Sequence, residues 1–134
     1  MIIILGSFQK NTFEIVRSIL EFLELDKQVH IPQFESLSPN FNDFVENLAI
    51  KFFNWDNFVE IIKNKSPSER QEMVIILSPE FNLAEQFQQL FNIHEYFPLN
   101  VKKIISIIDG HYFDDHHENL LDAMAYFADI LLID

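Results

Sequence analysis

The chain has 134 residues, a length typical of one domain, and 49% of them are hydrophobic, which is enough apolar surface for a core of its own. Twenty-one acidic against nine basic residues give a formal net charge of -12, which makes nucleic acids and anionic membrane surfaces poor partners. The absence of cysteine excludes disulfides, thiolate metal sites and a cysteine nucleophile. The sequence begins without a secretion signal, and no apolar run approaches the roughly 20 residues that span a bilayer, so we expect a soluble cytoplasmic protein.

Apolar runs bounded by turn residues alternate with stretches of helical period, a pattern typical of βαβ units with a parallel sheet. Strands are predicted at Ile2–Leu5, Val29–Ile31, Met73–Leu77, Lys103–Ile108 and Ile130–Ile133. The runs at residues 2–5, 73–77 and 104–108 lack polar alternation, as strands buried on both faces do, so they are predicted to be central. The sequence therefore predicts one three-layer α/β domain over residues 1–134, with a mainly parallel sheet.

Helical periodicity occurs between the predicted strands. The first helix is predicted over residues 11–25, where apolar side chains recur at three- and four-residue steps. Further helices are predicted from Asn42 to Phe53, from Trp55 to Lys63, over about residues 82–91 with Asn82 as a cap, and from Asp115 to Phe127. The segment from Trp55 to Lys63 either continues the preceding helix after a break or forms a short helix of its own. Turn residues and charges predict a surface loop from Asn64 to Arg70.

The turn after the first predicted strand stands where a phosphate-binding loop would lie. Such a loop, G-x-x-x-x-G-K-[ST], uses glycines so that backbone N–H groups wrap the phosphates, a lysine for the outer phosphates and a hydroxyl for magnesium. Gly6 is the only glycine in this turn. A register shift of one residue puts Thr12 at the hydroxyl position, but Asn11 then stands at the lysine position and Lys10 at the second glycine. The alternative is a structural turn in which Thr12 or Asn11 caps the helix.

Three segments, in order, carry a family resemblance. The first is Ile2 to Thr12, a strand, a loop and a helix start; the second is Met73 to Ala84, a strand followed by Ser78-Pro79-Glu80 and a helix. The third is Val101 to Gly110, a strand ending in Asp109, with Ala128 to Ile133, an alanine-aspartate pair entering a strand. Together they resemble the GTPase domain of the CobW/HypB/UreG family, a branch of the P-loop GTPases that serves metal-cofactor assembly.

The resemblance implies a P-loop NTPase-like fold that binds GTP with Mg²⁺. Gly6, Lys10, Asn11 and Thr12 would meet the phosphates at the positive end of the first helix, and Asp109 would lie at the neighbouring strand end. The departures are large: the loop lacks its second glycine and its lysine, residues 32–40 lack the family's cysteine motif, and the guanine-reading sequence would follow the last strand. We therefore expect a degenerate, shortened member with weak or no GTP hydrolysis and a possible link to metal-cofactor assembly.

Candidate metal ligands are densest after the fourth predicted strand. The cluster comprises Asp109, His111, Asp114, Asp115, His116, His117 and Glu118. Imidazole and carboxylate groups together suit zinc, nickel or iron, and His111 with Asp115 or His116 can converge on Zn²⁺ if the loop folds back. Neighbouring histidines point different ways on a helix, so His116 and His117 are not expected to share one ion. The alternative is an exposed, acidic helix start.

Aromatic residues offer a different route to function. Six of them fall within an 18-residue stretch: Phe41, Phe44, Phe52, Phe53, Trp55 and Phe58. They either fill the core or form an interface, because aromatic side chains dominate interface hot spots. The alternative to a nucleotide-binding function is thus a non-enzymatic protein-interaction or dimerisation module that retains only the fold. This module would use the aromatic segment or the open last strand, and we expect a protein partner or a homodimer.

Overall fold

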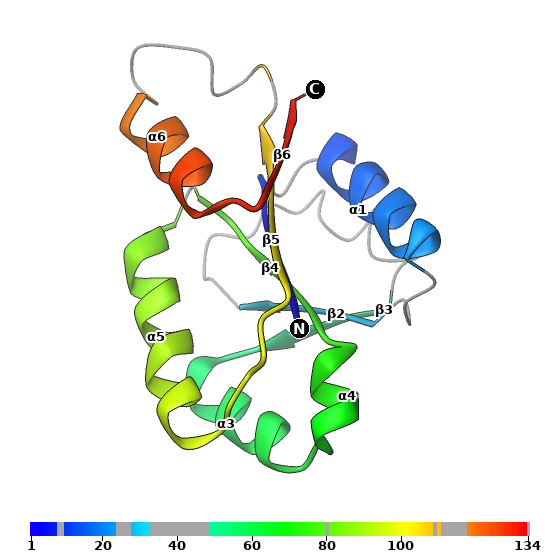
Figure 1. The fold of residues 1–134 in the computed structure, drawn as a ribbon, viewed down its shortest axis with the longest axis vertical. Coiled ribbons are helices and arrows are strands. Elements are labelled where there is room, and N and C mark those ends of the chain that lie inside the picture. The colour runs from blue at the N-terminus through cyan, green and yellow to red at the C-terminus, as the bar shows by residue number, and fades with distance from the viewer. Residues whose placement is uncertain are drawn as a thin grey trace.

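A computed structural model of the chain describes residues 1–7, 10–23, 28–32, 49–79, 81–108, 110 and 118–133. Within these residues six strands form one sheet in which all pairs are parallel, and helices pack on both of its faces (Figure 1). The fold class predicted from the sequence, a three-layer α/β arrangement with a parallel sheet, is confirmed.

The strands and helices follow the predicted alternation. The strands are β1 (Ile2–Leu5), β2 (Gln28–Pro32), β3 (Ala49–Phe53), β4 (Val74–Leu77), β5 (Lys103–Ile108) and β6 (Ile130–Ile133). The helices are α1 (Lys10–Phe22), α3 (Trp55–Lys63), α4 (Pro67–Gln71), α5 (Leu83–Tyr96) and α6 (Glu118–Phe127). The strand order is β3-β2-β4-β1-β5-β6, so the three strands with continuous apolar runs, β4, β1 and β5, are central as predicted.

The strand order determines which face each helix covers. From β1 the chain moves to β2 and β3 at one edge, then returns to β4 and continues through β5 to β6 at the other edge. Because crossovers between parallel strands are right-handed, helices that precede this reversal of direction lie on one face of the sheet and helices that follow it lie on the other. Accordingly, α1 lies on one face of the sheet, and α3, α5 and α6 lie on the other (Figure 1).

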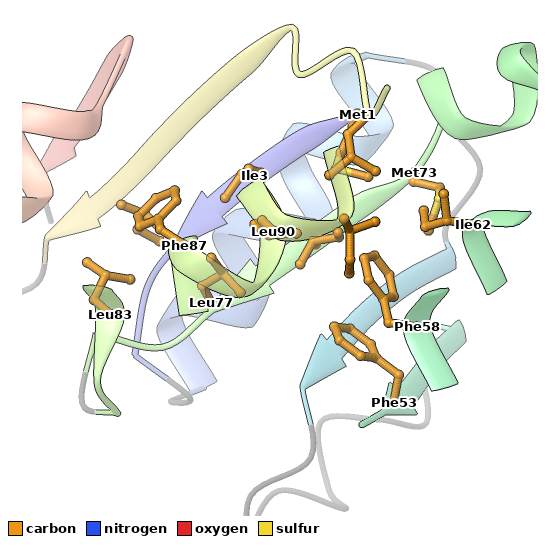
Figure 2. Close-up of a cluster of buried hydrophobic side chains, with 14 of the residues drawn as sticks. Met1, Ile3, Phe53, Phe58, Ile62, Met73, Leu77, Leu83, Phe87 and Leu90 are labelled. Carbon is orange, nitrogen blue, oxygen red and sulfur yellow. The ribbon is translucent and has the colours of Figure 1, made fainter. Parts of the chain in front are cut away.

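Two apolar clusters fill the space between the sheet and its helices. Successive strand residues alternate between the faces, so Ile3 packs with α3 and α5, whereas Ile4 packs with α1. Figure 2 shows the cluster on the α5 face, where Phe58 from α3 and Leu90 from α5 lie against the sheet. All four of these side chains are buried, and this removal of apolar area from water is the main force that holds the helices on the sheet.

Part of the aromatic segment lies in this core. The Phe53 and Phe58 side chains are buried and their rings stack with centroids 4.3 Å apart. Trp55 packs edge-on against both rings, and its ring centroid lies 5.2 Å from that of Phe53 and 5.7 Å from that of Phe58. Residues 41 and 44 lie outside the described residues. Of the two alternatives for the aromatic segment, core or interface, Phe53 and Phe58 follow the first, because both fill the core.

The prediction of a helix from Asn42 to Phe53 is wrong for residues 49–53, which form β3; residues 42–48 lie outside the described part of the chain. Strand β3 pairs in parallel with β2, with Ile50 opposite Val29 and Phe52 opposite Ile31. Its β-branched and aromatic side chains suit a strand. The prediction failed because the period of a short apolar run does not separate a helix from a strand.

The segment after β3 contains two helices with clear starting signals. Helix α3 is separate from the preceding residues, as one of the two alternatives had it, and the Asn54 side chain accepts a hydrogen bond from the Asn57 N–H at 2.8 Å. The predicted loop from Asn64 to Arg70 includes the start of the short helix α4. This helix opens with a capping box between Ser66 and Glu69, a helix-start signal that lies inside the segment predicted as a loop.

The remaining predicted helices are present with shifted bounds. Helix α1 begins at Lys10 and α5 extends to Tyr96, five residues beyond the predicted end at residue 91. Asn82 caps α5 as predicted, because its side chain accepts a hydrogen bond from the Glu85 N–H at 3.1 Å. None of the helices in the described ranges is both long and apolar enough to cross a membrane.

Candidate functional site

The carboxyl ends of β1 and β5 lie side by side, with Leu5 opposite Ser106. The chain leaves β1 toward α1 on one face and leaves β5 toward α6 on the other face. Open parallel sheets bind ligands at such a change of direction between neighbouring strands. Of the predicted phosphate-site residues, the structure describes Gly6 and Thr12 in full.

Gly6 allows a close approach between the end of β1 and helix α1. A Cβ atom at this position would lie 2.8 Å from Cγ2 of Thr12, closer than two carbon atoms can pack. Its φ angle is not positive, so the backbone conformation itself does not demand glycine. In the described structure the absence of a side chain at Gly6 therefore permits the close packing of α1 on the strand end, and its predicted contact with a phosphate stays a prediction from the sequence.

Thr12 is tied to the end of β1 through its hydroxyl group as well. Its Oγ1 lies 3.2 Å from Oγ of Ser7, and both side chains are buried. Because α1 begins at Lys10, both Asn11 and Thr12 lie inside the first turn of the helix, and the predicted capping role of either residue is wrong. The Thr12 hydroxyl is thus engaged in a buried contact and is not exposed to solvent.

The other predicted site residues are not placed with their side chains. Lys10 and Asn11 belong to the backbone of α1, but their side chains lie outside what the structure describes. Asp109, predicted to lie at the neighbouring strand end, follows β5 directly in the sequence and is also outside. The adjacency of β5 and β1, on which its predicted position depends, is present.

The predicted metal ligands, His111, Asp115 and His116, lie outside the described residues. Within the described ranges no group of three or more His, Asp or Glu side chains is arranged to hold a metal ion. Zinc binding by His111 and its neighbours therefore stays a prediction from the sequence.

The loop after β4 is held by a glutamine that the sequence analysis did not single out. The buried Gln86 side chain of α5 donates from Nε2 to the carbonyl oxygens of Ser78 at 2.9 Å and Phe81 at 3.0 Å. Together with the Asn82 cap, this bonding gives the loop a structural role at the described residues. The amphipathic pattern of residues 82–91 contained one signal, a polar residue at position 86 on the apolar face of the helix.

A large apolar groove lies on the α1 face of the sheet, away from the carboxyl ends of β1 and β5. It measures about 980 Å³ and runs between α1 and strands β5 and β6. Its lining residues are Ile2, Glu14, Ile15, Ser18, Ile19, Phe22, Leu23, Gln71, Lys102, Lys103, Ile105, Ile130 and Leu132. Most of them are apolar, and Phe22 at the end of α1 is 86% exposed. The sequence did not predict this groove, because it depends on which face each crossover takes.

Strand β6 exposes apolar side chains at the edge of the sheet. Within the described residues it is hydrogen-bonded to β5 alone, which confirms its predicted place as an edge strand. Ile130 and Leu131 are 42% and 43% exposed, and Ile133 is 66% exposed. A natural edge strand is usually protected by lysine, proline or a bulge, whereas this one consists of isoleucine and leucine only.

The fold and these features define an α/β protein with a doubly wound parallel sheet of P-loop NTPase-like architecture. Comparisons with protein-family models and with curated proteins find no match. Among solved structures, the chain is similar to a de novo designed protein of P-loop NTPase fold, with a TM-score of 0.52 and 9% identity over 99% of this chain and 80% of that one.

A second similar structure is the N-acetylgalactosamine-specific IIB component 1 of a PTS system from Escherichia coli. The TM-score is 0.51 and the identity 10%, over 100% of this chain and 93% of that one. At identities this low, the likeness shows the fold alone. The P-loop NTPase-like fold implied by the sequence is thus supported, and the specific CobW/HypB/UreG resemblance is not.

Proposed function

We propose that this chain is a non-enzymatic association module that keeps a P-loop NTPase-like fold and pairs with a second copy through β6. The observation that carries the proposal is the apolar edge strand, whose Leu131 and Ile133 are both more than 40% exposed. An edge strand offers unpaired N–H and C=O groups to another chain, and apolar side chains beside them add a hydrophobic contribution on pairing.

Two copies related by a two-fold axis would place their β6 strands antiparallel, so that the two sheets continue into one another. This arrangement makes the interface isologous, with the same surface used on both sides. Leu131 and Ile133 share the face of Ser106, their side chains would meet those of the second copy, and both would lose exposure. The buried contacts and the added ladder of hydrogen bonds together favour dimers at micromolar concentrations.

The test is sedimentation equilibrium of the wild-type chain and of two lysine variants. Ile133→Lys places a charge in the proposed interface and is expected to shift the chain to monomers. Tyr126→Lys is the matched control, because Tyr126 is a large, 83% exposed side chain on α6 and not on β6. A monomeric wild type at about 100 μM, or a dimer that Ile133→Lys leaves intact, would rule out the proposal.

A second candidate function is nucleotide binding at the carboxyl ends of β1 and β5, as in a degenerate CobW/HypB/UreG-type domain linked to metal-cofactor assembly. The observation that favours it is the reversal of chain direction between these two neighbouring strands. In this function Lys10, Asn11 and Asp109 would contact GTP and Mg²⁺, and His111 with its neighbours would hold Zn²⁺.

Calorimetric titration of the chain with GTP and with ATP, each with Mg²⁺, tests this candidate. The wild type is compared with Lys10→Ala, because the Thr12 hydroxyl is engaged with Ser7 whereas a lysine at the helix start suits a phosphate. Micromolar binding that Lys10→Ala abolishes would favour the nucleotide site. Absence of binding at millimolar nucleotide would leave the association module as the function.

A further inference from the structure

The groove on the α1 face lies between α1 and the edge strand β6. Neighbouring strands lie about 4.8 Å apart and a helix is about 10–12 Å wide, so one helix covers roughly two strands. Helix α1 packs through Phe13, Val16 and Leu20 against the sheet and buries Ile105 of β5. No helix of the described chain covers β6 on this face, where Ile130 is 42% exposed. We infer that this groove binds an amphipathic α-helix of a partner protein, lying alongside α1 with its carboxyl end at Lys102 and Lys103.

The groove has an apolar floor and an apolar wall. The floor consists of Ile105 from β5 with Ile130 and Leu132 from β6. The wall consists of Ile19 and Phe22 from α1, and Phe22 is 86% exposed. A helix with an apolar stripe at i, i+3, i+4 and i+7 would bury these side chains, which is how amphipathic helices bind in hydrophobic grooves.

The length of the groove sets the length of the helix. The lining strand residues extend from Lys103 of β5 to Leu132 of β6, which is in register with Ile107, and so cover about 16 Å at 3.3 Å per residue. A helix rises 1.5 Å per residue, so about 11 residues extend along the floor. This is close to the 13 residues of α1, which lies on the same face of the sheet.

Charge sets the direction of the helix. Lys102 and Lys103 line the end of the groove at the start of β5, and Glu14 lines it near the start of α1. A helix carries partial negative charge at its carboxyl end, so this end, and acidic side chains in its last turn, are attracted by the two lysines. The pair is distinctive in a chain that has only nine basic residues against twenty-one acidic ones.

This surface is separate from the edge used in the proposed dimer, and the inference does not depend on that function. Ile130 is in register with Ile105 and faces the groove, whereas Leu131 is in register with Ser106. The Ser106 hydroxyl donates to the carbonyl oxygen of Met124 in α6, so Leu131 faces the opposite side of the sheet. Adjacent residues of nearly equal exposure, 42% and 43%, therefore serve different surfaces.

The experiment is a titration of the isotope-labelled chain with a synthetic 14-residue amphipathic peptide that carries a leucine stripe and three glutamates in its last turn. Binding is followed by NMR methyl shifts. The largest shifts are expected at Ile19, Ile105, Ile130 and Leu132, with a dissociation constant in the range of about 10 to 500 μM. No binding at millimolar peptide, or shifts confined to other residues, would overturn the inference.

A matched pair of variants tests the position of the site. Ile130→Glu is expected to weaken binding by about tenfold or more, whereas Leu131→Glu is expected to change it by less than about twofold. Both variants place a charge in the same edge strand, so an effect on folding or on β6 pairing would appear in both. Equal effects of the two variants would contradict a groove on the α1 face.

A charge exchange tests the direction of the helix. The double variant Lys102→Glu/Lys103→Glu is expected to weaken binding of the glutamate peptide by about fivefold. The same variant is expected to bind more tightly to a peptide with lysines in its last turn. If the double variant still binds the glutamate peptide more tightly than the lysine peptide, the assigned direction of the helix is wrong. If a second copy of the wild-type chain fills the groove, methyl shifts at Ile15 and Ile19, which lie on α1 and not on the β6 edge, will depend on protein concentration without peptide, and the partner-helix inference fails.

Discussion

The Thr12 side chain contacts the end of β1 through both of its branches. Its Oγ1 lies 3.2 Å from Oγ of Ser7, and its Cγ2 would lie 2.8 Å from a Cβ atom at residue 6. The start of α1 is thereby held close against the strand end. This close packing gives Gly6 a reason to be glycine that does not involve any ligand.

Gly6→Ala is therefore expected to destabilise the chain by about 1–3 kcal/mol, because the new Cβ would lie 2.8 Å from Thr12 Cγ2 and α1 would have to shift. Urea unfolding measured by circular dichroism gives the change in the free energy of unfolding.

The control is Gly6→Ala combined with Thr12→Ser, which removes the clashing Cγ2 but keeps the hydroxyl for Ser7. The next atom near a Cβ of residue 6 is Cβ of Ile107 at 3.6 Å, an ordinary contact. The second substitution is expected to recover most of the lost stability, so that the two effects are strongly non-additive. If the effects of the two substitutions on the free energy of unfolding simply add, the contact with Thr12 is not the reason why residue 6 is glycine.

Much of the fold could be predicted from the sequence, because continuous apolar runs such as Ile2–Leu5 and Val74–Leu77 have only one stable place, the centre of a parallel sheet. Strand β3 was missed because Ile50 and Phe53 fit both a helical and an extended pattern over so short a run. Its pairing with β2 is a long-range contact that local periodicity does not contain.

The candidate site was less predictable. The spacing of Gly6 and Thr12 predicted a shared place in a phosphate-binding loop, but it did not predict that the two residues are buried and pack against each other. The apolar groove escaped prediction because Ile130 and Leu132 look like any strand residues until the chain direction shows that no described helix covers β6 on this face. A spacing motif describes which side chains are near each other, not whether they are free to bind.

Asn54→Ala is expected to destabilise the chain by about 1 kcal/mol. The Asn54 side chain accepts the Asn57 N–H at 2.8 Å at the start of α3, and alanine would leave this N–H without its partner. Urea unfolding provides the measurement, with Asn54→Asp expected to restore the cap. Asn57→Ala is the control, because it keeps the backbone N–H, and a loss as large as that of Asn54→Ala would argue against capping.

Asp129→Ala is expected to loosen β6. The Asp129 carboxylate accepts the Ile104 N–H at 2.8 Å, and the Asp129 N–H donates to the Ile104 carbonyl at the same distance, which joins the start of β6 to β5. Loss of the side-chain bond is expected to cost about 1 kcal/mol and to speed amide hydrogen exchange in residues 130–133. Asp122→Ala, at an exposed position of α6, should leave this exchange unchanged. Unchanged exchange in Asp129→Ala would show that backbone pairing alone fixes the strand.

His30 makes the stability of the chain depend on pH. The side chain is buried in β2, and burial, followed by the nearby Lys65 and Lys51, lowers its pKa from 6.5 to about 4. Its Nδ1 has no hydrogen-bond partner within the described structure. Between pH 6.5 and pH 4 the unfolded chain binds a proton at this residue that the folded chain does not bind. The free energy of unfolding therefore falls as pH falls through this window, and His30 imposes no such cost above it.

His30→Leu removes the titrating group and the unpartnered nitrogen at similar volume. At about 1.4 kcal/mol per pKa unit, the variant is expected to gain up to about 2 kcal/mol over the wild type at pH 5 compared with pH 7.5. Urea unfolding of both proteins at the two pH values measures this difference. Carboxylates that titrate in the same range affect both chains alike, so the comparison isolates His30. Stability curves that stay parallel from pH 7.5 to pH 5 would mean that the folded and unfolded chains protonate this histidine equally.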